Sequence, residues 1–76
     1  MIFLIEYEAS RGRLISMRRF ADAERGEAAD ARLQLELELG RHGIVREVVV
    51  LEAASEDDIR RTHGRYFLVG DPPYGA

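Results

Sequence analysis

The chain contains no cysteine, lysine or asparagine, and it has only two prolines. Without cysteine it forms no disulfide bond and performs no thiolate chemistry. All 11 basic residues are therefore arginine, a side chain that binds phosphate bidentately. Codon usage in a GC-rich genome explains the joint lack of lysine and asparagine better than selection for phosphate binding does. The net charge of −3 also argues against a general polyanion binder.

A long hydrophobic run is also missing. The apolar start, residues 1–5, is closed by Glu6 and Glu8. A membrane span needs about 20 apolar residues, and a secretory signal needs a basic flank and a longer apolar region. We therefore expect no membrane segment, and we expect a cytoplasmic protein.

The length of 76 residues is enough for one domain. Apolar residues make up 46% and charged residues 33% of the chain, which is typical of globular proteins. So short a domain buries only roughly 60–65% of its unfolded surface, and self-association would add to its stability. We predict a single α+β domain over residues 1–69 and a disordered tail over residues 70–76.

The first part of the chain predicts a β-hairpin. Residues 2–8 and residues 13–20 both alternate in the manner of strands. Gly12 can supply the left-handed conformation that a three-residue hairpin loop needs. Strict alternation would place Leu14 and Phe20 on the same face of the second strand.

Residues 23–39 are mostly strong helix formers, and Asp22 stands where an N-cap is expected. Propensity and length favour a helix that Gly40 or Gly43 would end. The end of this segment also alternates leucine with polar residues, which is the period of a strand, so both interpretations of residues 33–39 stay open. As a helix, it carries leucines on two sides: Leu33, Leu35, Leu37 and Leu39.

A third strand is predicted over residues 45–53. Its centre, Val48 to Leu51, is apolar on both faces, which indicates a strand that is covered on two sides. A second helix follows, capped by Ser55. Arg60 and Arg61 lie four residues after Glu56 and Asp57, the spacing of helical ion pairs.

The resulting element order, β-β-α-β-α, predicts a three-stranded antiparallel sheet with spatial order 2-1-3, packed with two helices. For residues 65–69 helix, loop and a short fourth strand all stay open. In this topology the third strand has a free edge and is the more apolar of the two edge strands. Such an edge normally needs covering or pairing.

The apolar third strand and the two-sided helix leave more apolar surface than so short a chain can cover. A symmetric homodimer is the commonest way to bury such surface. Our leading hypothesis is a non-enzymatic interaction module that self-associates; an accessory subunit of a larger complex, with another protein as partner, is an alternative. The candidate association residues are Val48, Val50, Leu35 and Leu39.

Residues 60–67 combine three arginines, a histidine and two aromatic residues. Arginine clamps phosphate and an exposed tyrosine stacks on bases, so a nucleic-acid or nucleotide-phosphate binder is a further alternative, although not the favoured one. The opposing and preferred interpretation is that Ile59 and Phe67 belong to the core while the arginines pair with nearby acids. The candidate ligand-binding residues are Arg60, Arg61, His63, Arg65 and Tyr66.

No pattern indicates catalysis, a metal site or a cofactor. Thr62 and His63 are adjacent on a helix and therefore diverge, and no third group holds a base beside a nucleophile. The arginines around His63 would repel a cation. The glycine spacing matches no nucleotide-binding loop. We expect no enzymatic activity, no metal and no cofactor.

The end of the chain resembles a group of known sequences. Arg-Arg-Thr-His-Gly-Arg-Tyr-Phe at residues 60–67, after Val-Val-Val-Leu-Glu-Ala at residues 48–53, is similar to small bacterial proteins to which no activity is assigned. The resemblance extends over most of the chain. It implies no site residue.

Overall fold

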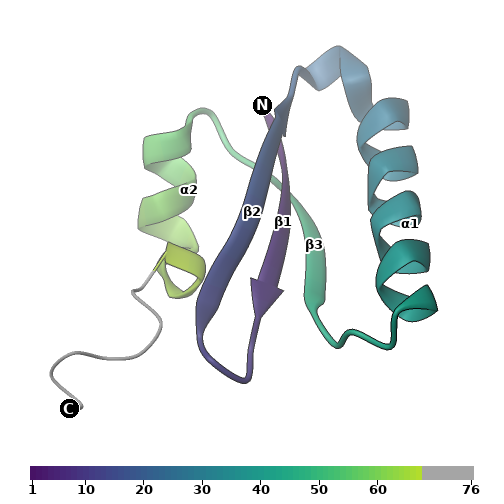
Figure 1. The fold of residues 1–76 in the computed structure, drawn as a ribbon. Coiled ribbons are helices and arrows are strands. Elements are labelled where there is room, and N and C mark those ends of the chain that lie inside the picture. The colour runs from purple at the N-terminus through teal and green to yellow at the C-terminus, as the bar shows by residue number, and fades with distance from the viewer. Residues whose placement is uncertain (68–76) are drawn as a thin grey trace, which may run out of the picture.

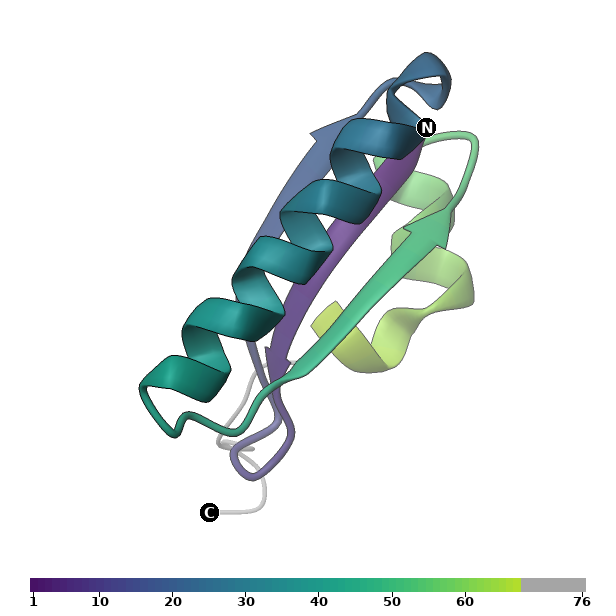
Figure 2. The ribbon, with the colours of Figure 1, turned by 90° about the vertical axis from the view of Figure 1, so that its right-hand side faces the viewer.

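The structure is a computed structural model that describes residues 1–67. Three antiparallel strands form one sheet in the order β2-β1-β3, with a helix on each face (Figures 1 and 2). The predicted α+β class and the 2-1-3 strand order are confirmed. The elements are β1 (Ile2–Glu8), β2 (Arg13–Phe20), α1 (Arg25–Arg41), β3 (Glu47–Glu52) and α2 (Glu56–Thr62), with short 3-10 helices η1 (Asp22–Glu24) and η2 (Gly64–Phe67).

The central strand β1 is buried from Ile2 to Tyr7. Successive side chains of a strand point to opposite faces, so a central strand covered on both sides must be apolar on both. Helix α1 covers the face of Ile2 and Leu4 (the α1 face), while α2 and η2 cover the face of Phe3 and Ile5 (the α2 face). The apolar start that was too short to span a membrane is thus the core of the domain.

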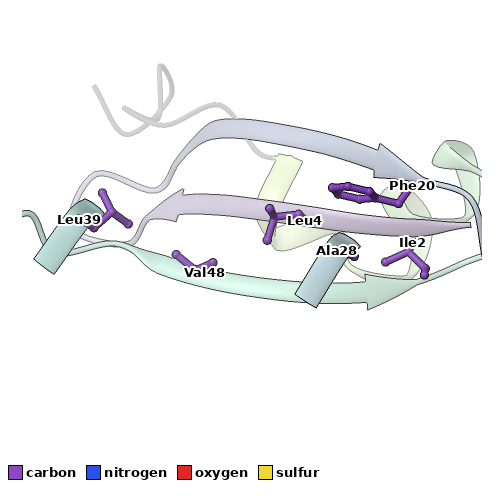
Figure 3. Close-up of a cluster of buried hydrophobic side chains, with 6 residues drawn as sticks. All are labelled: Ile2, Leu4, Phe20, Ala28, Leu39 and Val48. Carbon is purple, nitrogen blue, oxygen red and sulfur yellow. The ribbon is translucent and has the colours of Figure 1, made fainter. Parts of the chain in front are cut away.

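Two apolar clusters fill the two interfaces. Figure 3 shows the first, between α1 and the sheet, where the short side chain of Ala28 lets the helix approach the strands. Its buried members are Ile2, Leu4, Phe20, Ala28, Leu39 and Val48. The second cluster joins the sheet to α2 and η2, and its buried members are Phe3, Ile5, Tyr7, Ile59 and Tyr66.

The hairpin has the predicted strands but a different register on β2. Gly12 has φ 62°, the left-handed conformation that was expected of it. A β-bulge interrupts the ladder: Glu6 pairs with Ser16, but Tyr7 pairs with Leu14, which leaves Ile15 as the extra residue. The extra residue turns Leu14 to the α2 face, against the second cluster, whereas Phe20 lies in the first. The prediction that these two share a face is therefore wrong.

Helix α1 settles the ambiguity of residues 33–39, which are helical throughout. The predicted cap is wrong: Asp22 lies in η1, and its carboxylate accepts a hydrogen bond of 2.5 Å from the Met1 ammonium. Glu24 binds the free Ala21 amide instead, at 2.7 Å.

The C-terminal end of α1 is a Schellman motif, in which Gly43 has φ 65°. The Gly43 amide donates to the Gly40 carbonyl and the Ile44 amide to the Leu39 carbonyl. Gly43, not Gly40, therefore ends the helix, because only the former takes the left-handed conformation.

Helix α2 begins as predicted, with the Ser55 hydroxyl accepting from the Asp58 amide at 3.1 Å. Arg60 pairs with Glu56 as expected, but Arg61 pairs with Asp58, one helical position from the predicted partner. Residues 64–67 form η2, which corrects the alternative of a fourth strand there. Residues 68 and 69, and the expected tail over residues 70–76, lie outside the described residues.

Candidate interaction surface

The outer edge of β3 pairs with no other strand among the described residues. The Ala53 amide donates to the Met1 carbonyl at 3.0 Å, which makes these two a hydrogen-bonded pair. Because such pairs alternate along an antiparallel ladder, β3 bonds to β1 through its odd-numbered residues. The amides and carbonyls of Val48, Val50 and Glu52 consequently point away from β1, at the free edge.

The side chains of the same residues lie on the α1 face. Val48 is buried, Val50 is half-buried against the first cluster, and Glu52 is exposed. The segment that leads into β3 is more open still: Ile44 is 42% exposed and Val45 is 91% exposed. An apolar strand of this kind, with its edge unpaired, is a template for pairing with a further strand.

A cavity of about 270 Å³ opens between the first half of α1 and β3. Its floor is apolar, and its rim carries two arginines and one glutamate. Arg25 pairs with Glu52 across it, and Arg32 pairs with Glu36 at 3.5 Å along the helix. The lining residues are Ile2, Arg25, Ala28, Ala29, Arg32, Val50 and Glu52. Since these charges are already neutralised in pairs, the rim presents no free site for an anion.

A wider hollow of about 430 Å³ lies at the C-terminal end of β2 and includes Phe20, Asp22 and Arg19 in its wall. Its charges are also paired. Asp22 holds the Met1 ammonium, which lowers the pKa of the Asp22 carboxyl, and Arg19 lies 3.4 Å from Glu56.

The structure divides the four leucines of α1 between two surfaces. Leu39 is buried and Leu35 is half-buried, both against the sheet. Leu33 and Leu37 are 53% and 52% exposed on the outer side of the helix. The sequence predicted leucines on two sides of this helix. The uncovered pair, however, is Leu33 and Leu37, whereas the named candidates Leu35 and Leu39 help to hold the protomer together.

A buried ion pair lies beside the start of β3. Arg46 donates through Nη1 to Glu6 Oε2 on the central strand, and its Nε lies 3.9 Å from Glu8 Oε2. Ser16 donates to the other Glu6 oxygen at 3.3 Å. The side chains of Arg46 and Glu6 are only 19% and 10% exposed, and Nε of Arg46 is buried without a hydrogen-bond partner. This pair fixes the chain that enters β3 against β1.

The arginines of residues 60–67 are engaged within the domain. Arg60 pairs with Glu56 at 3.0 Å and stacks on the Phe67 ring at 4.6 Å. Arg65 pairs with Glu47 at 2.5 Å and lies over the Tyr66 ring at 4.3 Å. These contacts match the interpretation in which the arginines pair with nearby acids.

Tyr66 does not offer a free ring for stacking. It is buried and meets Tyr7 edge to face, with ring centroids 5.1 Å apart. Its hydroxyl donates to Glu47 Oε2 at 2.6 Å and accepts from Arg65 at 2.8 Å. Burial, and then the hydrogen bond to Glu47, raise the pKa of Tyr66 above its ordinary value of 10.0. The ring and hydroxyl therefore tie η2 to β3.

The two histidines lie at helix ends. His42 contacts Glu38 at 3.0 Å. His63 contacts the Thr62 hydroxyl at 2.9 Å, so the prediction that these two side chains diverge is wrong: His63 is the C-cap of α2 and has left the helical conformation. No cluster of three or more metal-binding side chains occurs within residues 1–67. In the same part of the chain, no helix is both long and apolar enough to cross a bilayer.

Comparisons of the chain with protein families, with curated proteins and with solved structures find no match.

Sequence reasoning missed the charged ends of the β3 edge. Arg46 and Glu52 each lie three residues from Val49 and have opposite charges, and Glu47 and the apolar run from Val48 to Leu51 lie between them. The pattern is visible in the sequence. It indicates a pairing edge only once the structure shows which residues have their amides and carbonyls at the free edge of β3.

Proposed function

We propose that this protein is a non-enzymatic interaction module that self-associates as a homodimer through the free edge of β3. The observation that carries the proposal is the unpaired apolar edge at Val48 and Val50, with an open cavity beside it. Pairing of two β3 strands would continue the sheet from one protomer into the other. It would satisfy the backbone groups at the edge and remove apolar side chains from water.

Two features support a second copy as the occupant. A closed, symmetric pairing uses up the β3 edge on both partners and leaves only the more polar β2 edges at the ends of the joined sheet. Edge strands that stay single in natural proteins are usually blunted by an inward-pointing charge, a proline or a central bulge. From Val48 to Leu51, β3 has none of these.

The alternatives have weaker support. A nucleic-acid or nucleotide-phosphate binder would need free arginines and an open aromatic ring, whereas Arg60 and Arg65 are paired and Tyr66 is buried. The exposed Leu33 and Leu37 favour a role as accessory subunit, with a protein partner on the outer side of α1. We place the module in the cytoplasm as part of the same proposal, which fractionation of native cells would test.

Light scattering after size-exclusion chromatography tests the proposal. We expect the wild-type chain to have twice its 8.6 kDa mass at high micromolar concentration. Val50→Lys places a charge at the pairing edge and should give a folded monomer, as edge lysines do in natural sheets. Leu37→Lys, with the same change of charge on the outer side of α1, should stay dimeric. A wild-type chain that remains monomeric throughout the concentration series refutes the proposal.

A further inference from the structure

This inference rests on the proposed self-association and specifies its geometry. We infer that the two β3 strands pair antiparallel in the register that places Val49 opposite the partner subunit's Val49. The same register brings Arg46 of each copy opposite the partner subunit's Glu52. The second copy thereby completes the mouth of the cavity between α1 and β3.

Backbone direction limits the possible registers. Only residues whose amides and carbonyls face outward can bond across the new ladder, and on β3 these are Val48, Val50 and Glu52. A twofold axis perpendicular to the sheet pairs each outward residue with another outward residue. The axis must therefore pass at a residue and not between two of them, and the central choices are Val48, Val49 and Val50.

The side chains that would face each other across the two strands then distinguish these three registers. With Val49 on the axis, Val48 faces the partner subunit's Val50 and Arg46 faces the partner subunit's Glu52, so apolar meets apolar and cation meets anion, twice each. With Val50 on the axis, Val48 would face the partner subunit's Glu52. With Val48 on the axis, Val50 would face the partner subunit's Arg46. Each of these two alternatives sets a charge against a valine and forms no pair of opposite charges. The Val49 register sets Glu47 against the partner subunit's Leu51 on the α2 face, but of the three it alone forms pairs of opposite charge.

The charged residues are available for this pairing. Glu52 pairs with Arg25, and half of its side chain is exposed. Arg46 donates through Nη1 to Glu6, and its Nε lies 3.9 Å from Glu8 Oε2, while 19% of its side chain is exposed. A guanidinium carries five donors, so Arg46 retains donors for one further carboxylate.

The cavity gains a wall in this register. Val50 and Glu52 line it on the β3 side. Their cross-strand neighbours would be the partner subunit's Val48 and the partner subunit's Arg46, both on the same face of the sheet as α1. The apolar floor is then covered by a valine, and the rim receives one further cation beside Glu52.

A cysteine scan measures the register, because the natural chain has no cysteine. We would make V48C, V49C and V50C separately, confirm folding by circular dichroism, oxidise each and run non-reducing electrophoresis. A residue on the axis meets its own copy. At Val49 that pair is not hydrogen-bonded, so its Cβ atoms lie closest to the separation that a disulfide needs. We expect V49C to form the covalent dimer and the other two to stay largely unlinked.

The outcomes separate this inference from the proposed function. Preferential linkage of V48C or V50C would overturn the register while leaving edge pairing intact. A dimer by light scattering in which no variant becomes linked would overturn pairing through β3. A monomer would overturn both the proposed function and the inference.

Charge reversal gives an independent measurement. Glu52→Arg would set arginines opposite each other at both ends of the ladder, and the dimer dissociation constant should rise about tenfold. Glu36→Arg, the same reversal on α1, should leave it unchanged. Equal effects of the two reversals would contradict the Arg46–Glu52 pairing.

Discussion

Replacing Ile59 by alanine tests how the α2 face of the sheet is closed. Ile59 is 0% exposed and is the buried residue of α2, packed against the second cluster. The substitution removes three carbon atoms, worth about 2.4 kcal/mol at ~0.8 kcal/mol per buried methylene. The cavity left behind raises the expected loss to about 3–4 kcal/mol. A chain of this length has a total stability of about 4–11 kcal/mol, so at least a quarter of it should be lost.

Urea unfolding followed by circular dichroism measures this loss, at one fixed protein concentration because self-association adds to apparent stability. The melting temperature should fall by at least about 12 °C, at ~4 °C or more per kcal/mol for a domain of this size. Leu37→Ala is the matched control, since it deletes the same number of carbons from a half-exposed site and should change stability by less than about 0.5 kcal/mol. A loss below about 1 kcal/mol for Ile59→Ala would refute the packing of α2 on the sheet.

Two further predictions concern the hydroxyl of Tyr66 and the glycines at the end of α1. The raised pKa of Tyr66 means that the folded state holds this proton more tightly than the unfolded state, so stability is retained below about pH 10 and lost as pH rises through the folded pKa. Urea titrations between pH 8 and pH 11 (about the range of tyrosine ionisation) should show that the free energy of unfolding falls more steeply with pH for the wild type than for Tyr66→Phe. Equal slopes would contradict the raised pKa of Tyr66. Gly43→Ala should destabilise the domain by about 1 kcal/mol because φ is positive there, whereas Gly40→Ala, in open space within the helix, should stabilise it by about 0.5–1 kcal/mol. The same thermal melts compare the two glycine variants, and a stable Gly43→Ala would rule out the Schellman motif.

The sequence predicted the parts of the fold that local rules determine. The hairpin strands end where alternation ends, and Ser55 caps α2 because a hydroxyl at that position meets a free amide. The bulge at Ile15 was missed, although the adjacent apolar residues Leu14 and Ile15 interrupt the alternation there, because only pairing with β1 shows which residue is extra. For α1, composition selected the helix correctly but gave no means of choosing which leucines face the sheet.

Which side of α1 packs on the sheet depends on small residues, not on the leucines themselves. Ala28 and Ala31 lie on the same side of α1 as Leu35 and Leu39, and their short side chains allow close approach to the sheet. Leu33 and Leu37 would keep the helix farther away. Leucine is more hydrophobic than alanine, so the leucines dominate the hydrophobic pattern of the sequence. The alanines nevertheless determine which side of the helix faces the sheet.

The two faces of the sheet are closed by different means, and the difference explains where the interaction surface lies. On the α2 face a short helix suffices, because Tyr66 and Phe67 add aromatic bulk and Glu47, at the start of β3, is tied to η2 through Arg65 and the Tyr66 hydroxyl. On the α1 face the first half of the helix contacts the sheet through alanines and the second half through leucines, and the alanines bring the helix close but cover little width. The β3 side of that face stays open as a cavity. An unpaired edge and an uncovered flank thus coincide on one strand, where a single added strand would close both.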